Sequence, residues 1–123
     1  MPDRPVVMVV EDDQEMNELE RELLEAYGMD SVPAYTGSEA VEVFRQCRAD
    51  AVLLDIMLPE IDGFETCRLL RAASTARIPI VILTALDGDD SRRRGYEVGA
   101  DAYFCKPFDP DEVAQKLSDL LTR

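Results

Sequence analysis

Charged and hydroxyl side chains follow four of the apolar runs in this sequence. Acids come directly after the first run, an aspartate interrupts the third, a threonine ends the fourth and a lysine follows the fifth. These residues are Glu11, Asp12, Asp13, Asp55, Thr84 and Lys106. Carboxylates that crowd together raise one another's pKa unless a cation lies among them. Oxygen-only ligands favour a hard ion, and a site that keeps positions open for water and phosphate suits Mg²⁺ better than Ca²⁺.

Each of these residues also has an ordinary structural interpretation when it is taken alone. Glu11 and Asp12 could complement the dipole at the start of a helix. Thr84 could be a hydroxyl at the end of a strand, and Lys106 a surface lysine. Asp55 is harder to explain in this way, because an unpaired carboxylate at the end of a buried apolar strand is costly in free energy. A functional site is favoured by their joint placement.

Five apolar runs predict the strands that would position these side chains. Three of the runs are nearly continuous rather than alternating, which is typical of strands buried on both faces of a parallel sheet. The predicted strands are Val6–Val10, Ser31–Tyr35, Ala51–Leu58, Ile78–Leu83 and Asp101–Phe104. Right-handed crossovers then place helices on both faces, so the fold class is α/β, a doubly wound (βα)₅ domain. Ligands of such sheets bind beyond the carboxyl ends of the strands.

Stretches with helical period follow the apolar runs. Capping residues open three of them, at Thr36, Asp62 and Asp109. The stretch 88–96 has few apolar positions and a glycine near each end, so it should be the least firmly packed helix. The first helix is expected to turn one face inward, formed by Met16, Leu19, Leu23 and Ala26 with Tyr27.

Composition limits the classes of function. The 123 residues suffice for one domain with its own core, and we expect a single domain over 1–123. The formal charge of −13 repels phosphate backbones, so the domain should not bind nucleic acid by itself. No apolar run is long enough to span a membrane, and the N-terminus lacks the pattern of a signal peptide. A cytoplasmic location is therefore expected.

Histidine and cysteine usage narrows the chemistry further. The chain has no histidine, which excludes Ser-His-Asp and Cys-His catalysis and a phosphohistidine on this chain. Its three cysteines, Cys47, Cys67 and Cys105, form no CxxC pair. A disulfide framework or a zinc site is thus disfavoured, and we expect three buried, inert thiols.

Four segments together resemble the receiver domains of response regulators in two-component signalling. They are VVMVVEDD at the first strand, AVLLDIMLPEIDGFE at the third, PIVILTAL at the fourth and GADAYFCKPF at the fifth. Each segment alone is a weak signal, but the four occur in order at matching spacing and cover essentially the whole chain. The resemblance implies a flavodoxin-like, CheY-like fold with five parallel strands in the order 2-1-3-4-5.

The resemblance also implies a role for the acidic residues. Asp55 would be the nucleophile that accepts a phosphoryl group from a phosphohistidine. Asp12 and Asp55 would bind Mg²⁺ directly, and Glu11 would bind it through a metal-bound water. The backbone carbonyl of Met57 would complete the protein ligands.

Three further residues would assist the phosphoryl transfer or transmit the signal in a domain of this family. Lys106 would pair with Asp55 and then with the phosphoryl oxygens, and the family pattern implies a cis bond between Lys106 and Pro107. Thr84 would bind the phosphoryl group through its hydroxyl. Tyr103 would be the switch aromatic, repacking the face formed by the stretch 88–96, the fifth strand and the last helix.

Two positions depart from the family pattern. Ala102 stands where an aspartate is usual in receivers that dimerise through this face, so we expect that dimer to be altered or absent. Met57 and Leu86, two residues after Asp55 and Thr84, are both apolar and offer nothing to orient an attacking water. We therefore expect a slowly hydrolysing aspartyl phosphate.

Three other classes of function remain as alternatives. A phosphatase with an aspartate nucleophile would need a second acid two residues after Asp55, where Met57 stands. A nucleotide- or flavin-binding domain would need a glycine-rich loop after the first strand, where acids stand instead. A degenerate receiver that only binds proteins is disfavoured, because all five site positions carry suitable side chains. The domain should not be a conventional enzyme.

The partners implied are those of a signalling receiver. A sensor histidine kinase or a histidine phosphotransfer protein would donate the phosphoryl group. An effector domain, a downstream protein or a second copy of the chain would receive the signal. The chain ends at Arg123, where an effector domain would begin in a larger regulator, so both a stand-alone receiver and a piece of a longer protein fit.

Overall fold

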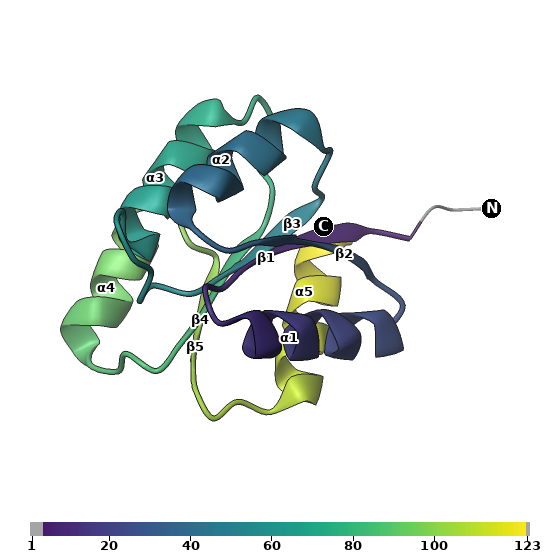
Figure 1. Ribbon diagram of the computed structural model, residues 1–123. Helices are drawn as coiled ribbons and strands as arrows, with labels where there is room; N and C mark the ends of the chain where they lie inside the picture. Colours follow the sequence, from purple (N-terminus) through teal and green to yellow (C-terminus); the bar gives the residue numbers. More distant parts are fainter. Residues whose placement is uncertain (1–3, 123) are drawn as a thin grey trace.

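The computed structural model describes residues 4–122, in which five strands and five helices alternate. The strands are β1 (Val6–Val10), β2 (Asp30–Ala34), β3 (Ala51–Leu54), β4 (Ile80–Thr84) and β5 (Ala102–Cys105). The helices are α1 (Gln14–Ala26), α2 (Gly37–Gln46), α3 (Gly63–Ala73), α4 (Asp89–Glu97) and α5 (Pro110–Leu121). All strand pairs are parallel, in the order β2-β1-β3-β4-β5, so the predicted fold class is confirmed (Figure 1).

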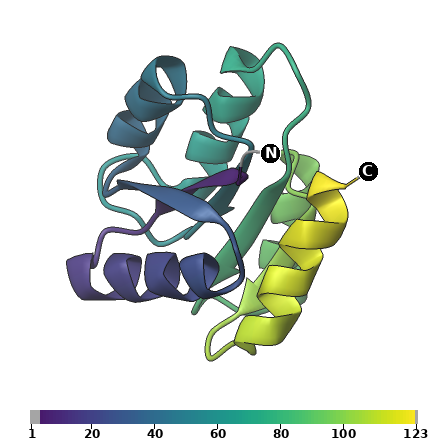
Figure 2. The ribbon, with the colours of Figure 1, turned by 90° about the vertical axis from the view of Figure 1, so that its right-hand side faces the viewer.

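The helices form a layer on each side of the sheet. Helices α1 and α5 cover one face, and α2, α3 and α4 cover the other (Figures 1 and 2). Alternate residues of β1 serve the two layers, since Val7 and Val9 pack with α1 and α5 while Met8 and Val10 pack with α2 and α3. The central strands are therefore buried on both faces, which explains their continuous apolar sequences.

The third apolar run forms a shorter strand than predicted. Strand β3 ends at Leu54, and the chain turns away at Asp55, whose carboxylate accepts a hydrogen bond from the amide of Met57 at 3.1 Å. Ile56 and Leu58 follow the strand but are still buried, because Ile56 packs in a cluster with Phe64 and Tyr103 and Leu58 packs in the core between the sheet and helices α2 and α3. Their apolar character extended the predicted strand beyond its true end.

The predicted inward face of α1 is correct only in part, because Met16 and Leu23 are half-buried but Leu19, Ala26 and Tyr27 are exposed. Its buried residues are Asn17, Glu20 and Leu24, whereas Leu19 is 48% exposed. The Asn17 amide explains the rotation of the helix, because it donates to three backbone carbonyl groups at the ends of β1 and β2. These acceptors belong to Val9, Glu11 and Ala34, at 3.0–3.2 Å. Polar residues of α1 thus face the sheet where β1 and β2 end.

Side chains cap three helices as predicted. The Thr36 hydroxyl accepts from the Glu39 amide, and the Asp62 carboxylate from the Glu65 amide. Asp109 caps α5 in the same way, with a proline at the first helical position. These caps satisfy backbone donors that a helix start leaves free.

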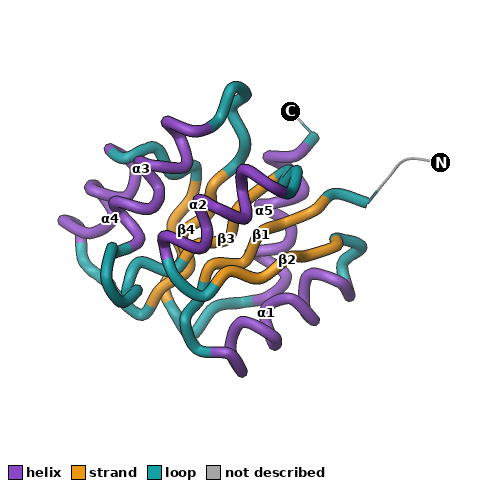
Figure 3. Tube along the Cα trace, turned by 45° about the horizontal axis from the view of Figure 1, so that its top comes forward, coloured by secondary structure: helices purple, strands orange, loops and turns teal. Residues whose placement is uncertain are grey.

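Helix α4 has the fewest buried side chains to hold it. Only Gly95 is buried in this helix, and Gly88 at its start provides no side-chain cap. Two arginines contribute instead, since Arg92 lies 5.0 Å from the ring centre of Tyr103 and Arg94 lies 4.4 Å from that of Phe64. The expected weak packing of this helix thus has a structural basis. Figure 3 shows α4 beside α3, at the end of the helical layer.

The expectation of three buried thiols is confirmed for one cysteine only. Cys67 is buried between α3 and the sheet, but Cys47 is exposed and Cys105 is half-buried. Cys47 ends α2 as its C-cap residue, where the chain turns away from the core. No helix among residues 4–122 is long and apolar enough to cross a membrane.

We predict that Gly63→Ala lowers the free energy of unfolding by about 3 kcal/mol. A β-carbon at Gly63 would lie 2.3 Å from the carbonyl oxygen of Asp55 and 2.5 Å from Cα of Ile56, both of which are backbone atoms. Denaturant unfolding measures the loss. Arg68→Ala, at an exposed position of the same helix, should change stability by less than about 0.5 kcal/mol. Equal stability of the two variants would contradict this close contact.

Candidate acidic site at the sheet edge

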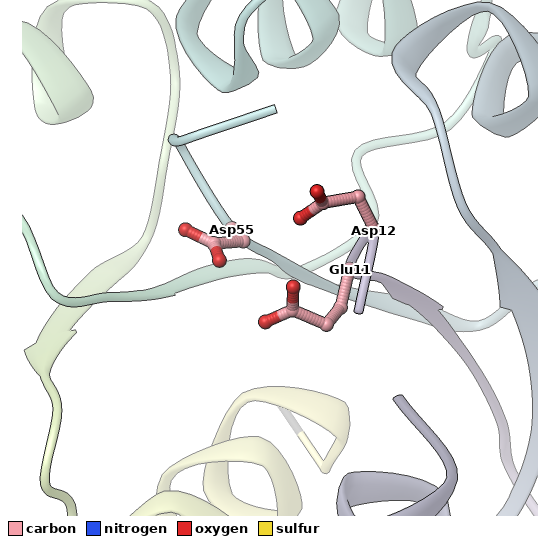
Figure 4. A group of neighbouring side chains, drawn as sticks. All are labelled: Glu11, Asp12 and Asp55. Carbon is pink, nitrogen blue, oxygen red and sulfur yellow. The ribbon is translucent and has the colours of Figure 1, made fainter. Parts of the chain in front are cut away.

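Neighbouring strands bring three carboxylates together at the carboxyl edge of the sheet. Strands β1 and β3 pair directly, with Val10 beside Leu54, so the residues that follow them are adjacent. Glu11, Asp12 and Asp55 each contribute an oxygen, and these oxygens lie within 4.8 Å of one another. Figure 4 shows the three side chains directed toward a common space. The predicted convergence of these acids is therefore observed.

Burial of this acidic group is uneven. Glu11 is 3% exposed and Asp55 is 8% exposed, whereas Asp12 lies on the surface. The group therefore has a protected floor and an open side. Such a site can admit a small ligand from solvent while the floor keeps the local dielectric low.

Lys106 supplies the positive charge of the site. Its ammonium donates to Oε1 of Glu11 at 2.6 Å and to Oδ2 of Asp55 at 3.4 Å. The backbone places it there, because the Lys106 amide donates to the carbonyl oxygen of Thr84 and extends the pairing of β4 with β5. The Lys106–Pro107 bond is cis, as the family pattern implied.

The electrostatics leave a surplus of negative charge. Burial raises the pKa of Glu11 to about 7, although the hydrogen bond from Lys106 opposes the rise. Burial alone would lower the pKa of Lys106, but its bond to Glu11 and the nearby charge of Asp55 hold that pKa above its usual value. The single positive charge of Lys106 thus does not balance the negative charges around it, and a cation bound among the carboxylates would reduce their repulsion.

The donor set fits a hard divalent cation. All three converging groups offer carboxylate oxygens, and one of them faces solvent, where a bound ion could keep water ligands. Lys106 stays on the Glu11 and Asp55 side of the group. The arrangement matches the preference of Mg²⁺ for a few carboxylates together with water and phosphate oxygens.

Glu20 is a site residue that the sequence analysis missed. It projects from α1, is 4% exposed, and places Oε2 at 3.7 Å from the Lys106 ammonium. That distance allows an ion pair but exceeds a hydrogen bond, and Oε2 has no hydrogen-bond partner among the described residues. Burial raises the pKa of Glu20 to about 8. No sequence signal marked it, because α1 was expected to present another face.

Thr84 and Tyr103 both contact Leu86 rather than the acids. The Thr84 hydroxyl is fully buried and accepts a hydrogen bond from the Leu86 amide at 3.3 Å. The Tyr103 hydroxyl donates to the Leu86 carbonyl oxygen at 2.6 Å, and its side chain is 5% exposed. The loop after β4 therefore connects the two residues that were expected to form the switch.

Arg92 extends this connection to α4, which the sequence analysis did not foresee. Besides stacking on Tyr103, its guanidinium donates to the Tyr103 carbonyl oxygen at 3.2 Å and to Sγ of Cys105 at 3.3 Å. It also lies 3.7 Å from Asp87 in the loop after β4. A single side chain thus joins α4, β5 and that loop.

Ala102 and Met57 are two of the residues that depart from the family pattern, the first expected to alter a dimer and the second to slow hydrolysis. Ala102 is buried within β5, and the neighbouring Asp101 instead pairs with Arg71 at 2.9 Å and Arg77 at 2.6 Å. The Met57 side chain is 58% exposed beside the acids. Whether the Met57 carbonyl binds a metal stays a prediction.

Comparison with known proteins identifies relatives over nearly the whole chain. Residues 7–118 match the family model described as response regulator receiver domain. The chain is 38% identical over 120 residues to the DNA-binding dual master transcriptional regulator RpaA of Synechocystis, covering 97% of this chain and 50% of that protein. It is 39% identical to the response regulator MprA of Mycobacterium ulcerans, covering 95% and 50% respectively.

Solved structures give the same picture. The receiver domain of the Francisella response regulator 1452 superposes with a TM-score of 0.90 at 31% identity, covering 98% of both chains. The BeF3-activated N-terminal receiver domain of Klebsiella pneumoniae RstA superposes with a TM-score of 0.89 at 38% identity, covering 96% of this chain and 99% of that one. The chain spans about half the length of the curated relatives that it matches.

We predict that the metal-free protein loses stability as the pH rises from about 5 to about 8. In the folded protein the pKa of Glu11 is about 7 and that of Glu20 is about 8, whereas the ordinary value for both is 4.5. In this window the unfolded chain has released protons that the folded chain still binds, so rising pH favours unfolding. Denaturant unfolding in EDTA should show a loss of at least about 1 kcal/mol.

Matched variants test the source of this pH dependence. Glu20→Gln should reduce the slope of stability against pH, whereas Glu22→Gln, at an exposed position of the same helix, should leave it unchanged. Stability that stays flat or rises across the window in EDTA would contradict the assignment.

Proposed function

Because the chain belongs to the response regulator receiver domain family, we propose that it accepts a phosphoryl group on Asp55 and that this modification switches its output face. The observation that carries the proposal is the position of Asp55. It follows the central strand β3 at the carboxyl edge of the sheet, almost buried, next to Glu11 and Asp12 and within 3.4 Å of the Lys106 ammonium. The domain is thus a component of two-component signalling.

Phosphoryl transfer requires a positioned nucleophile and cations that balance the charge on the phosphoryl oxygens. Asp55 provides the nucleophile, and its Oδ1 is held by the Met57 amide. Asp12 and Asp55 would hold Mg²⁺ directly, Glu11 would hold it through a water, and the Met57 carbonyl oxygen would complete the protein ligands. When bound, Mg²⁺ neutralises charge on the oxygens of the transferring group. Lys106 orients Asp55 before transfer and binds a phosphoryl oxygen afterwards.

The switch follows from the contacts at Leu86. When a phosphoryl group occupies the site, the Thr84 hydroxyl turns toward it and gives up its bond with the Leu86 amide. The loop after β4 then moves, and Tyr103, whose hydroxyl bonds to the same residue, repacks with it. Arg92 carries the change to α4, so the face formed by α4, β5 and α5 alters.

The partners are those of a signalling module. A sensor histidine kinase or a histidine phosphotransfer protein donates the phosphoryl group, in the cytoplasm. The altered face acts on an effector domain, a downstream protein or a second copy of the chain, and the buried Ala102 changes how two copies would pair. Residues 1–123 form one receiver domain, which is a phosphoacceptor rather than a conventional enzyme. Its acidic surface does not bind nucleic acid directly.

We predict that Asp55→Asn abolishes covalent labelling by a small phosphodonor such as acetyl phosphate and leaves the fold intact. An amide in place of the carboxylate cannot attack phosphorus. Mass spectrometry measures the phosphorylated fraction, and thermal unfolding checks the fold. Asp90→Asn, an exposed exchange of the same kind on α4, should label like the wild type, and EDTA should prevent labelling. Full labelling of Asp55→Asn would exclude Asp55 as the acceptor.

We predict a phosphoryl half-life of minutes or longer, shortened by Met57→Asn by about three- to tenfold. The exposed Met57 side chain offers no polar atom to orient water beside Asp55, and asparagine does. The decay of labelled protein after removal of the donor measures the rate. Glu60→Gln, in the same loop, should decay like the wild type. A wild-type half-life of seconds at neutral pH would refute the prediction.

A further inference from the structure

Glu20 is a buried acid whose charge has only one nearby partner in the described part of the chain, the Lys106 ammonium at 3.7 Å. It lies 4% exposed on the inner face of α1. The small cavity that it lines is otherwise apolar, with contributions from Leu24, Leu53 and Phe108. Its Oε2 has no hydrogen-bond partner among residues 4–122. A buried carboxyl oxygen without a partner destabilises a fold, whereas an apolar side chain of similar size would fill this space favourably.

The group that Glu20 faces is the ammonium of Lys106. Three carboxyl groups surround this ammonium, at 2.6 Å for Glu11, 3.4 Å for Asp55 and 3.7 Å for Glu20. Glu11 and Asp55 belong to the edge of the sheet, whereas Glu20 approaches from α1. The Glu20 carboxyl group therefore attracts the ammonium from a direction that neither of the other two provides.

We propose that Glu20 is a positioning residue, which draws the Lys106 ammonium toward α1 and competes for it with the phosphoryl group on Asp55. The inference rests on the function proposed above, because it concerns the partner that Lys106 takes when Asp55 is modified. At 3.7 Å the Lys106 ammonium is attracted electrostatically, by the charge of Glu20 when that group is ionised and by the dipole of its carbonyl oxygen when it is protonated, so the competition operates in both states.

This competition affects the stability of the protein that carries a phosphoryl group on Asp55, relative to the unmodified protein. The phosphoryl group adds negative charge at Asp55. This charge is stabilised more strongly when the Lys106 ammonium moves fully toward the phosphoryl oxygens. Glu20 reduces this stabilisation, because it holds the ammonium at its position in the unmodified protein. Removing Glu20 should thus favour the modified state, at equilibrium, over the unmodified one.

The test measures equilibrium binding of beryllium trifluoride, an analogue of the phosphoryl group on aspartate, in the presence of Mg²⁺. We expect Glu20→Leu to bind the analogue about three- to tenfold more tightly than the wild type, the size of coupling seen between neighbouring groups. Mg²⁺ affinity without the analogue should stay equal or weaken, because a nearby negative charge has been lost. Thermal unfolding should show a midpoint equal to or above that of the wild type.

Three further variants separate this role from a general effect on the fold. Glu20→Gln retains an acceptor oxygen and should fall between the wild type and Glu20→Leu. Glu22→Leu, which removes a charge from the exposed side of α1, should bind the analogue like the wild type. In a Lys106→Met background, Glu20→Leu should no longer change the affinity, because the group for which Glu20 competes is absent.

The outcomes distinguish this inference from the proposed function. If the wild type neither binds the analogue nor labels on Asp55, the proposed function fails. If the wild type binds it and Glu20→Leu binds with the same affinity, or if the effect persists without Lys106, the positioning role is overturned. Should Glu20→Leu fail to fold, Glu20→Gln decides, and an affinity equal to that of the wild type in that variant also overturns the role.

Discussion

The ammonium of Lys106 lies within 3.7 Å of oxygens from Glu11, Asp55 and Glu20, and much of the site follows from this crowding. The parallel sheet creates the crowding, since it delivers the carboxyl ends of β1, β3 and β5 to one edge. One positive charge then stands against more than one negative charge at low dielectric. Crowded carboxylates of this kind favour a cation among them, because water screens the buried part of the site only weakly.

The sequence was sufficient to predict the parts of this arrangement that depend on the sheet. Continuous apolar runs identified the strands, and Asp55 was conspicuous because a charge interrupts one of them. Glu20 escaped notice because helix periodicity reports hydrophobicity, and α1 turns Asn17 inward to satisfy strand-end carbonyl groups. Cys47 was misjudged for a related reason, since it lies where α2 ends and its position depends on the turn.

Helix α4 illustrates a different relation between packing and function. Its sequence lacks an apolar face, and arginine contacts with Tyr103 and Phe64 take the place of aliphatic packing. Contacts of this kind are individually weak and depend on the orientation of each ring. A rotation of Tyr103 therefore removes a substantial part of what holds the helix, whereas a helix embedded in a large core would hardly respond.

The opposite edge of the sheet is built in another way. Arg71 donates to the carbonyl oxygens of Ile78 and Gly99 and pairs with Asp101, whose carboxylate also accepts from the Ile80 amide. These bonds tie the end of α3 to the starts of β4 and β5. The amino ends of β4 and β5 are thus held in place, whereas the acidic site lies at the carboxyl edge of the sheet. A change that begins at the acidic site would therefore leave this amino edge in place, and a protein bound there would sense little of it.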